Sequence, residues 1–184
     1  ILSDDFSSVY EATLQLIQAG VEDILYFTNS TSYSSKKKMA GYRSAMESQK
    51  LLRGSNLIQF YQGSHEDIHA MAEHLMKLYQ KGLQFHGIIA SDDCLAMGAV
   101  RFALDAGLSI PRDMCVIGYN NSLLVHCCEP EMSSIDNKLE TLCQSLILTL
   151  MGVLGGKEMP KQTVFSGEVI HRGTTLASSH DCQK

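Results

Sequence analysis

Residues 86–122 constrain the fold of this chain most, because they contain one complete strand–helix–strand unit. His86–Ala90 is a short apolar run, and Met114–Gly118 is a second one. Between them Leu95–Ala106 has helical periodicity, which Gly107 ends. Two parallel strands joined by a helix place the residues that follow each strand at one edge of a sheet, where open α/β folds bind ligands. The unit therefore predicts a small-molecule site at that edge.

Polar side chains stand at both strand ends of this unit. Ser91, Asp92 and Asp93 follow the first strand and supply a helix N-cap and an acidic first turn. Asn120 follows the second strand. We therefore expect Asp92 and Asn120 side by side at the carboxyl edge of the sheet.

The rest of the chain repeats the alternation of helix and strand. Helices are predicted at residues 6–19, 36–48, 64–79 and 138–154, and strands at residues 23–27, 57–61, 132–135 and 163–171. Ser64 is the predicted N-cap of the third helix, with Asp67 as its capping-box partner. The alternation predicts an α/β fold, a three-layer αβα arrangement with a parallel sheet between two helical layers.

Charge and cysteine content restrict the class of protein. The formal net charge of −5 argues against nucleic-acid binding by this segment itself, and the one basic run, Lys36–Lys38, is interpreted as a solvated helix start. No apolar run reaches the length of about 18 residues that a membrane span needs, and no signal-like segment follows Ile1. Six cysteines without a regular framework, including the adjacent Cys127 and Cys128, indicate reduced thiols and a cytoplasmic protein.

Two patterns suggest chemistry, and each has a simpler interpretation. His65 and His69 have a metal-like spacing on a predicted helix, but an exposed polar helix start explains them better, because the order HExxH is absent. Asp92 and Asp93 resemble an acid/base pair, yet neither a nucleophile elbow nor a phosphate-binding loop accompanies them. We favour one aspartate capping the helix and the other facing a ligand. The sequence thus predicts no catalytic residue, no metal and no cofactor.

Several motifs together resemble one family. ASDDCLAMGAV, GLSIPRDMCVIGYNN, EPEMSSI and VIHRGTT, in this order and spacing, resemble the effector-binding core of lactose-repressor/galactose-repressor (LacI/GalR) transcription regulators. The similarity continues upstream through LSDDFSSVYEATLQLIQAGVEDILYF and KKKMAGYRSAM. The resemblance implies a type I periplasmic-binding-protein fold, two subdomains that close over a ligand, dimerisation and a separate N-terminal DNA-binding domain, for which this chain shows no helix-turn-helix segment.

The resemblance also implies a division of the chain. Residues 1–136 correspond to the C-terminal subdomain of the effector-binding core, residues 137–165 to a segment that returns to the N-terminal subdomain, and residues 166–184 to the final strand and tail of the C-terminal subdomain. The helix at residues 138–154 is then expected to lack much of its packing partner. It should expose apolar surface, either as part of a longer protein or as a surface for association.

Ligand contacts follow from the resemblance at five positions. Asp92 and Asn137 match positions where the family presents polar groups to a ligand. Lys38 stands where the family usually has an Arg, and Asn120 stands where it usually has an Asp. His65 aligns with an aromatic residue that covers the ligand. Amide and ammonium groups both bind hydroxyls, so a sugar remains compatible with these departures.

Two positions match the dimer interface of related proteins. These are Met97 and Cys128, for which a buried helix residue and a loop thiol are equally good interpretations. The resemblance implies a homodimer that meets operator DNA only through the missing N-terminal domain.

The leading functional hypothesis is the effector-binding and dimerisation portion of a LacI-family repressor that senses a small polar metabolite such as a sugar. An extracytoplasmic sugar-binding protein of the same fold is the first alternative. An α/β enzyme that uses Asp92 and Asp93 is the second.

Overall fold

The fold is seen in a computed structural model that describes residues 1–51 and 57–176. Within these residues the main sheet has six strands in the order β3-β2-β4-β5-β6-β8. Their bounds are β2 (Ile24–Thr28), β3 (Ile58–Phe60), β4 (Gly87–Ala90), β5 (Cys115–Tyr119), β6 (Ser133–Asp136) and β8 (Glu168–Ile170). The first five are mutually parallel, and β8 runs antiparallel to β6.

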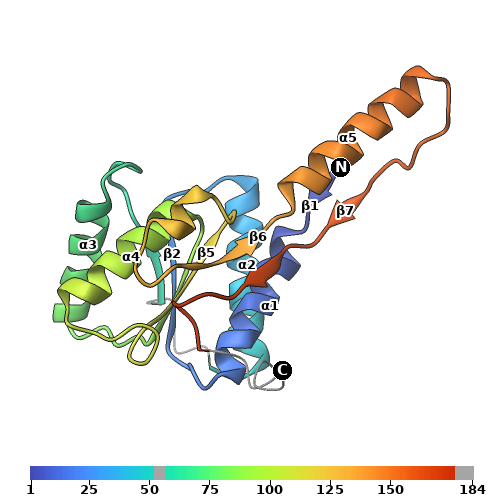
Figure 1. The fold of residues 1–184 in the computed structure, drawn as a ribbon. Coiled ribbons are helices and arrows are strands. Elements are labelled where there is room, and N and C mark those ends of the chain that lie inside the picture. The colour runs from blue at the N-terminus through green and yellow to red at the C-terminus, as the bar shows by residue number, and fades with distance from the viewer. Residues whose placement is uncertain (52–56, 177–184) are drawn as a thin grey trace, which may run out of the picture.

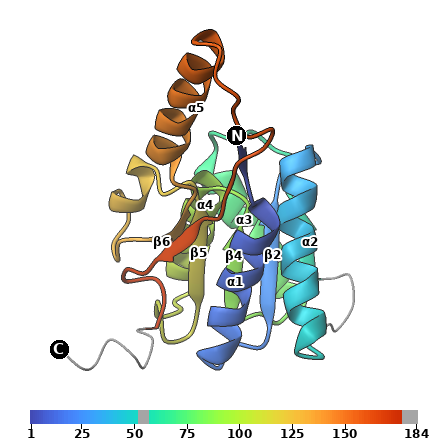
Figure 2. The same ribbon diagram turned by 90° about the vertical axis from the view of Figure 1, so that its right-hand side faces the viewer.

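Two pairs of helices cover the two faces of this sheet (Figures 1 and 2). One pair is α1 (Asp5–Gln18) and α2 (Tyr33–Ser48), and the other is α3 (Ile68–Gln80) and α4 (Asp93–Asp105). The three-layer αβα fold and the strand–helix–strand unit of residues 86–122 are therefore confirmed. The predicted parallel sheet is correct except at its edge, where β8 is antiparallel.

The core consists of two apolar layers, one on each face of the sheet. Along β2, Leu25 and Phe27 pack with α3 and α4, whereas Ile24 and Tyr26 pack with α1 and α2. All four side chains are fully buried. A strand covered on both faces needs apolar residues at every position, which explains the unbroken apolar run in the sequence.

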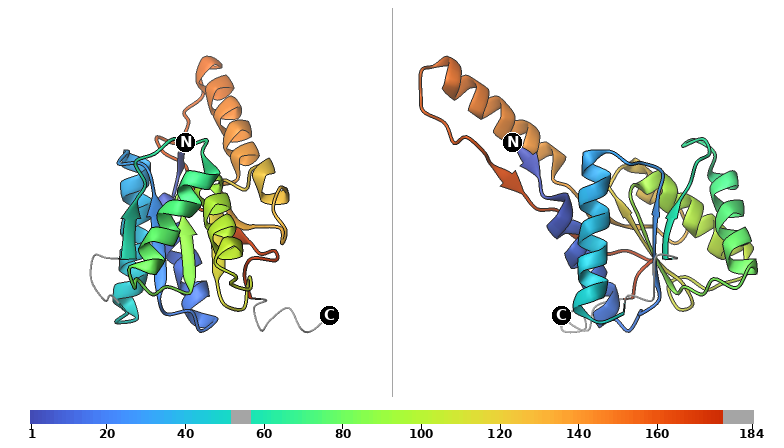
Figure 3. Two further views of the ribbon diagram at one scale, coloured as in Figure 1. Left: turned by 90° about the vertical axis from the view of Figure 1, so that its left-hand side faces the viewer. Right: turned by 180° about the vertical axis from the view of Figure 1, so that it is seen from behind.

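The helix α5 (Leu139–Leu154) extends away from the sheet and has no buried residue (Figures 1 and 3). Eight of its large apolar side chains are more than half exposed: Leu139, Leu146, Ile147, Leu148, Leu150, Met151, Val153 and Leu154. Beside it, β7 (Val164–Phe165) pairs in parallel with β1 (Leu2–Ser3) in a separate two-stranded sheet. The exposed apolar surface expected for this helix is thus present.

The single strand predicted at residues 163–171 is wrong, because it is two strands, β7 and β8, in different sheets. Gly167 lies between them and approaches the neighbouring chain closely. A Cβ at Gly167 would lie 2.7 Å from the carbonyl oxygen of Asp136. The N–H of Gly167 donates to Ser8 Oγ at 2.8 Å. The chain can change sheets here because this position has no side chain.

Two helix starts also differ from prediction. Helix α3 begins after Asp67, whose Oδ1 accepts from the N–H of Ala70 at 2.9 Å, while Ser64 Oγ accepts from the N–H of Glu66. His65 therefore precedes the helix and does not share a helix face with His69. Among the described residues, no group of three or more His, Cys, Asp or Glu side chains is suited to hold a metal ion.

Helix α2 begins at Tyr33, with Ser32 as its N-cap. The basic run therefore lies inside the helix, and Lys38 is only 8% exposed. The run is therefore not the helix start that was expected; Lys36 and Lys37 are solvated as expected, whereas Lys38 is buried. In the part of the chain that the structure describes, no helix is long and apolar enough to cross a membrane.

Candidate functional site

Four polar residues gather at the carboxyl edge of the main sheet. Asn29 follows β2, Asp92 follows β4, Asn120 follows β5 and Asn137 follows β6. Because these strands are parallel and adjacent, their carboxyl ends meet at the same edge. The predicted placement of Asp92 beside the end of β5 is confirmed.

Asp92 is both a helix cap and a reachable carboxylate. Its Oδ1 accepts from the N–H of Leu95 at 2.9 Å, which fixes the start of α4. The side chain is still 19% exposed, and Oδ1 lies 3.7 Å from Nε2 of His65. A carboxylate has about four acceptor positions, so capping leaves capacity for hydroxyl groups of a ligand.

Asp93 is buried and faces the protein. Its Oδ1 accepts from Ser134 Oγ at 2.6 Å, and its Oδ2 accepts from the N–H of Ser122 at 2.7 Å. Burial raises the pKa of Asp93, and these hydrogen bonds offset part of that effect. The prediction that one aspartate caps the helix is confirmed, but the second one does not face a ligand. Asp93 instead ties α4 to β6.

His65 covers the edge from the segment before α3. The Asn29 side chain donates from Nδ2 to His65 Nδ1 at 2.7 Å, and the Cys94 thiol donates to the His65 carbonyl at 3.1 Å. The ring is 51% exposed. These contacts hold His65 beside Asp92, where its ring can contact a ligand at the edge.

Lys38 reaches the same edge from α2. Its Nζ donates to the carbonyl of Ser91 at 3.0 Å and lies 3.4 Å from the ring centroid of Tyr119. Burial lowers the pKa of Lys38, and the nearby carboxylates, those of Asp5 and Asp92 among them, act in the opposite direction. The ammonium is therefore held mainly by the protein itself.

Tyr119 and Asp5 also act on this ammonium. The Tyr119 hydroxyl donates to Asp5 Oδ1 at 2.6 Å, although the two residues are far apart in sequence. Burial raises the pKa of Tyr119, so its hydroxyl stays protonated and remains a donor. A line of contacts thus runs from Asp5 through Tyr119 and Lys38 to Ser91.

Asn120 and Asn137 form the amide part of the site. Asn120 has a φ of 103°, a conformation that Asn tolerates better than most residues, and its side chain accepts from Nδ2 of Asn137 at 3.2 Å. Asn120 is exposed and Asn137 is half-buried. Each amide both donates and accepts, so the pair can bind hydroxyl groups.

The two residues predicted at a dimer interface lie on the α4 side of the molecule. Met97 and Cys128 are half-buried and pack against the core beneath α3 and α4. Leu123, at the start of η2 (Leu123–His126), is 83% exposed, and η2 contacts α4. The assignment of this surface to a dimer interface stays a prediction.

Asn29, Cys94, Tyr119 and Asp5 also belong to the carboxyl-edge site, and the sequence analysis did not select them. Asn29 follows β2 as Asp92 follows β4, so the rule that found Asp92 would have found it. Tyr119 and Asp5 gave no such signal, because their contact depends on how α1 packs against the sheet.

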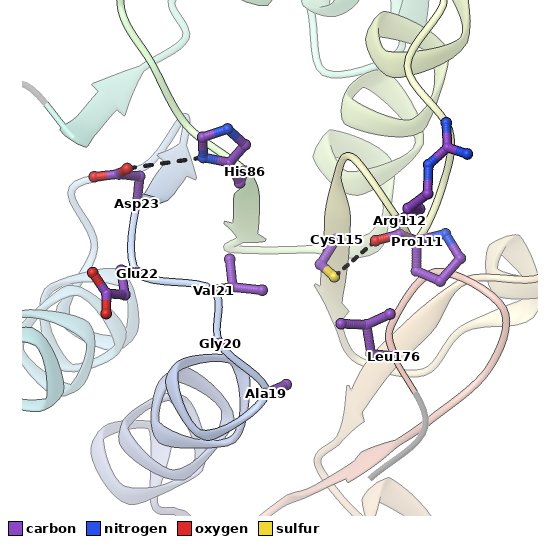
Figure 4. A pocket seen from close by; sticks show the side chains of 10 residues that line it. All are labelled: Ala19, Gly20, Val21, Glu22, Asp23, His86, Pro111, Arg112, Cys115 and Leu176. Atoms are coloured by element: carbon purple, nitrogen blue, oxygen red, sulfur yellow. Dashed lines mark hydrogen bonds and ion pairs between the residues drawn. The ribbon is translucent and has the colours of Figure 1, made fainter. Parts of the chain in front are cut away.

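A cavity of about 360 Å³ lies at the opposite, amino-terminal edge of the sheet (Figure 4). Its walls include Asp23 and His86, whose Oδ2 and Nδ1 atoms lie 3.8 Å apart, and Cys115, whose thiol donates to the carbonyl of Pro111 at 3.3 Å. Leu176 completes one side. The cavity is therefore separate from the polar residues at the carboxyl edge.

Comparisons with known proteins agree with this fold. Residues 13–175 match the family model described as periplasmic binding protein-like domain. The chain therefore belongs to the family of periplasmic binding protein-like domains.

Named relatives narrow the class within that family. The chain is 43% identical over 174 residues to an HTH-type transcriptional regulator of Lachnoclostridium phytofermentans, covering 95% of this chain and 51% of that protein. It is 28% identical over 177 residues to the HTH-type transcriptional regulator AscG of Escherichia coli, covering 96% and 52%.

A solved structure agrees with these relatives. It is a sugar-binding transcriptional regulator of the LacI family from Escherichia coli, complexed with phosphate, with a TM-score of 0.85 and 26% identity over 96% of this chain and 63% of that one. The resemblance to LacI/GalR regulators is thereby confirmed. The chain spans about half the length of the curated relatives it matches.

Proposed function

We propose that this chain is the effector-binding and dimerisation portion of a LacI-family transcriptional regulator, a repressor that senses a small polar metabolite such as a sugar. The observation that carries the proposal is the set of hydroxyl-binding side chains at the carboxyl edge of the sheet: Asp92, Asn120, Asn137 and His65. The relation to a regulator described as sugar-binding supports it.

Each side chain of the site has its own role toward the ligand in this proposal. Asp92 accepts hydrogen bonds from ligand hydroxyls, Asn120 and Asn137 donate and accept, and His65 covers the ligand from above. Lys38 adds a donor, because Nζ carries three N–H groups and Ser91 takes one of them. Such convergent polar groups on a rigid sheet edge are typical of sites for small polar molecules.

The proposal includes the division of the chain at residues 136 and 165. Residues 1–136 and 166–184 would form the C-terminal subdomain, and residues 137–165 would belong to the N-terminal one. The exposure of α5 supports this division, because a helix so apolar needs a partner surface. The site would then be completed when the two subdomains close over the effector.

Closure would be coupled to DNA binding through parts of the protein outside this chain. Two copies would associate through the α4 surface that includes Met97 and Cys128, and an N-terminal domain of the regulator would bind operator DNA in the cytoplasm. The effector would shift the equilibrium between DNA-competent and incompetent forms through its differential affinity for them.

An enzymatic role has less support than the proposed role as a regulator. The curated relatives are transcriptional regulators, which are not enzymes. Of the two aspartates that suggested acid/base chemistry, Asp93 has both oxygens bound to groups of the protein.

Titration calorimetry of the full-length protein with a panel of neutral mono- and disaccharides tests the proposal. At least one sugar should bind, and Asp92→Ala should weaken that binding by more than about tenfold, since a charge-assisted hydrogen bond contributes roughly 1.5–3 kcal/mol. Asp105→Ala is the matched control, because Asp105 is an exposed carboxylate at the other end of α4. Equal losses in the two variants would contradict the proposed site.

A further inference from the structure

The segment that follows β5 has a left-handed backbone at two successive residues. Asn120 has a φ of 103° and Asn121 a φ of 49°. Such values cost free energy in residues other than glycine, and they persist only where surrounding contacts hold the backbone. Because Asn120 is the residue of this segment that we expect to meet the effector, the contacts that hold residues 120–122 also set the direction of its amide.

The backbone of this segment is anchored to β6 and to the start of α4. The N–H groups of residues 120–122 donate, in that order, to the carbonyl of Ile135 at 2.9 Å, to Ser134 Oγ at 3.0 Å and to Asp93 Oδ2 at 2.7 Å. Ser134 Oγ itself donates to Asp93 Oδ1 at 2.6 Å, and both of these side chains are buried. The backbone donors are thus satisfied, and the side chain of Asn121 remains to be fixed.

Arg172 fixes that side chain. Its Nη2 donates to Asn121 Oδ1 at 2.8 Å, and its Nη1 donates to the carbonyl of Met132 at 2.9 Å. Its Nε lies 3.9 Å from Glu131 Oε2, and the Arg172 side chain is only 14% exposed. A planar guanidinium bonded at two points has a fixed orientation. It therefore restricts rotation of the Asn121 side chain and resists a change of φ at that residue.

The backbone of Arg172 lies away from the carboxyl edge. Arg172 follows β8, which runs antiparallel to β6, so that Glu168 is the end of β8 nearest this edge. The chain then leads away from the edge before it reaches Arg172. The Asn120 side chain instead lies at the edge, where it accepts from Nδ2 of Asn137 at 3.2 Å. Arg172 thus meets the site through Asn121.

We propose that Arg172 is a positioning residue of the effector site, which holds the side chain of Asn121 and thereby keeps the amide of Asn120 directed at the ligand. The inference rests on the proposed function, because it concerns the same site. It also gives the VIHRGTT motif, which contains Arg172, a part in effector binding.

Calorimetry on the full-length protein with glucose, galactose, ribose, maltose and cellobiose tests this role. Arg172→Met removes the guanidinium, and Asn121→Gly removes its acceptor while glycine keeps a positive φ accessible. Each variant should weaken sugar binding by about 5- to 20-fold, within the range for residues that modulate a site without touching its ligand. Asn121→Asp keeps an oxygen for Arg172 and should restore most of the affinity that Asn121→Gly loses.

A double-mutant cycle separates positioning from direct contact. If Arg172 acts through Asn121, the double variant Arg172→Met, Asn121→Gly should bind about as weakly as the weaker single variant. Losses that multiply would show that the guanidinium contacts the ligand itself, and would overturn the inference. The control is Arg101→Met, because Arg101 pairs with Asp105 and is exposed on α4. This control should leave sugar binding unchanged.

Hydrogen exchange of the full-length protein, followed by mass spectrometry, supplies a measurement that needs no ligand. A peptide that spans residues 119–124 should exchange at least about fivefold faster in Arg172→Met, because local opening becomes easier when a holding contact is lost. Peptides from β4 should exchange as in the unchanged protein. A uniform rise across the sheet would show a general loss of stability and would overturn a specific positioning role.

The outcomes separate this inference from the function on which it rests. Unchanged sugar binding in Arg172→Met would overturn the inference and leave sugar sensing intact. Unsubstituted protein that binds its operator and none of the five sugars would overturn sugar sensing, and with it the role of Arg172 toward a sugar.

Discussion

Gly118 and Asp93 should be strongly coupled in stability. A Cβ at Gly118 would lie 2.3 Å from Asp93 Oδ1 and 3.3 Å from Ala96 Cβ, in the middle of β5. Asp93 cannot move aside without losing its hydrogen bonds to Ser134 and Ser122. We therefore expect Gly118→Ala to lower the free energy of unfolding by about 2–3 kcal/mol, in the range for an overpacked core.

Removal of the carboxylate should relieve that clash. Asp93→Ala alone should cost about 3 kcal/mol, because it leaves two buried donors without their acceptor. In that background Gly118→Ala should cost less than about 0.5 kcal/mol, since a strand position tolerates Ala better than Gly once space exists. The double-mutant cycle should then give a coupling of about 2 kcal/mol.

Urea unfolding followed by circular dichroism measures all four proteins of the cycle. A second cycle that combines Gly118→Ala with Asp105→Ala is the control and should be additive, because Asp105 is exposed at the far end of α4. Additivity within about 0.5 kcal/mol for Gly118 and Asp93 would refute the packing argument.

Three further predictions concern a lysine, the exposed helix and the α4 surface. The pKa of Lys38 is lowered in the folded state, so between the folded and the unfolded pKa the unfolded chain binds more protons than the folded one. The free energy of unfolding should therefore rise with pH in this window, up to the unfolded pKa near 10.4. Denaturation at several pH values should show a smaller rise in Lys38→Met. The double variant Ile147→Lys, Leu150→Lys should reduce self-association of the 184-residue chain in analytical ultracentrifugation. Its free energy of unfolding should change by less than about 0.5 kcal/mol, because both side chains are more than half exposed. Unchanged association would show that α5 is not the contact surface. Leu123→Asp should weaken the dimer of the full-length protein at least about tenfold by sedimentation, since Leu123 is 83% exposed beside α4, and an unchanged dimer would place the interface elsewhere.

The sequence was sufficient for the centre of the fold and for part of the site. The strand–helix–strand unit was predictable because β4 and β5 are buried on both faces and the cap of α4 is unambiguous. The start of α3 was not, because Ser64 and Asp67 are both good caps and only the tertiary path selects Asp67. The break at Gly167 depends on a close approach to Asp136 that no local pattern records.

For the site too, local sequence predicted some residues, and others depend on tertiary contacts. Asp92 and Asn120 were predictable as strand-end residues, since the topology alone brings them to one edge. The burial of Lys38 was not, because it requires the Tyr119 ring and the Tyr119–Asp5 hydrogen bond, which join residues far apart in the chain. The different roles of Asp92 and Asp93 likewise depend on Ser122 and Ser134.

The most direct test of the proposed regulator is the affinity of the full-length protein for its own promoter DNA, measured by fluorescence anisotropy with and without the sugar that binds it. The account predicts that the sugar changes this affinity by about 5- to 150-fold, the usual range of allosteric coupling. Asp92→Ala should lose the response to sugar and keep the affinity for DNA in its absence. Sugar binding that leaves the DNA affinity unchanged would contradict the account.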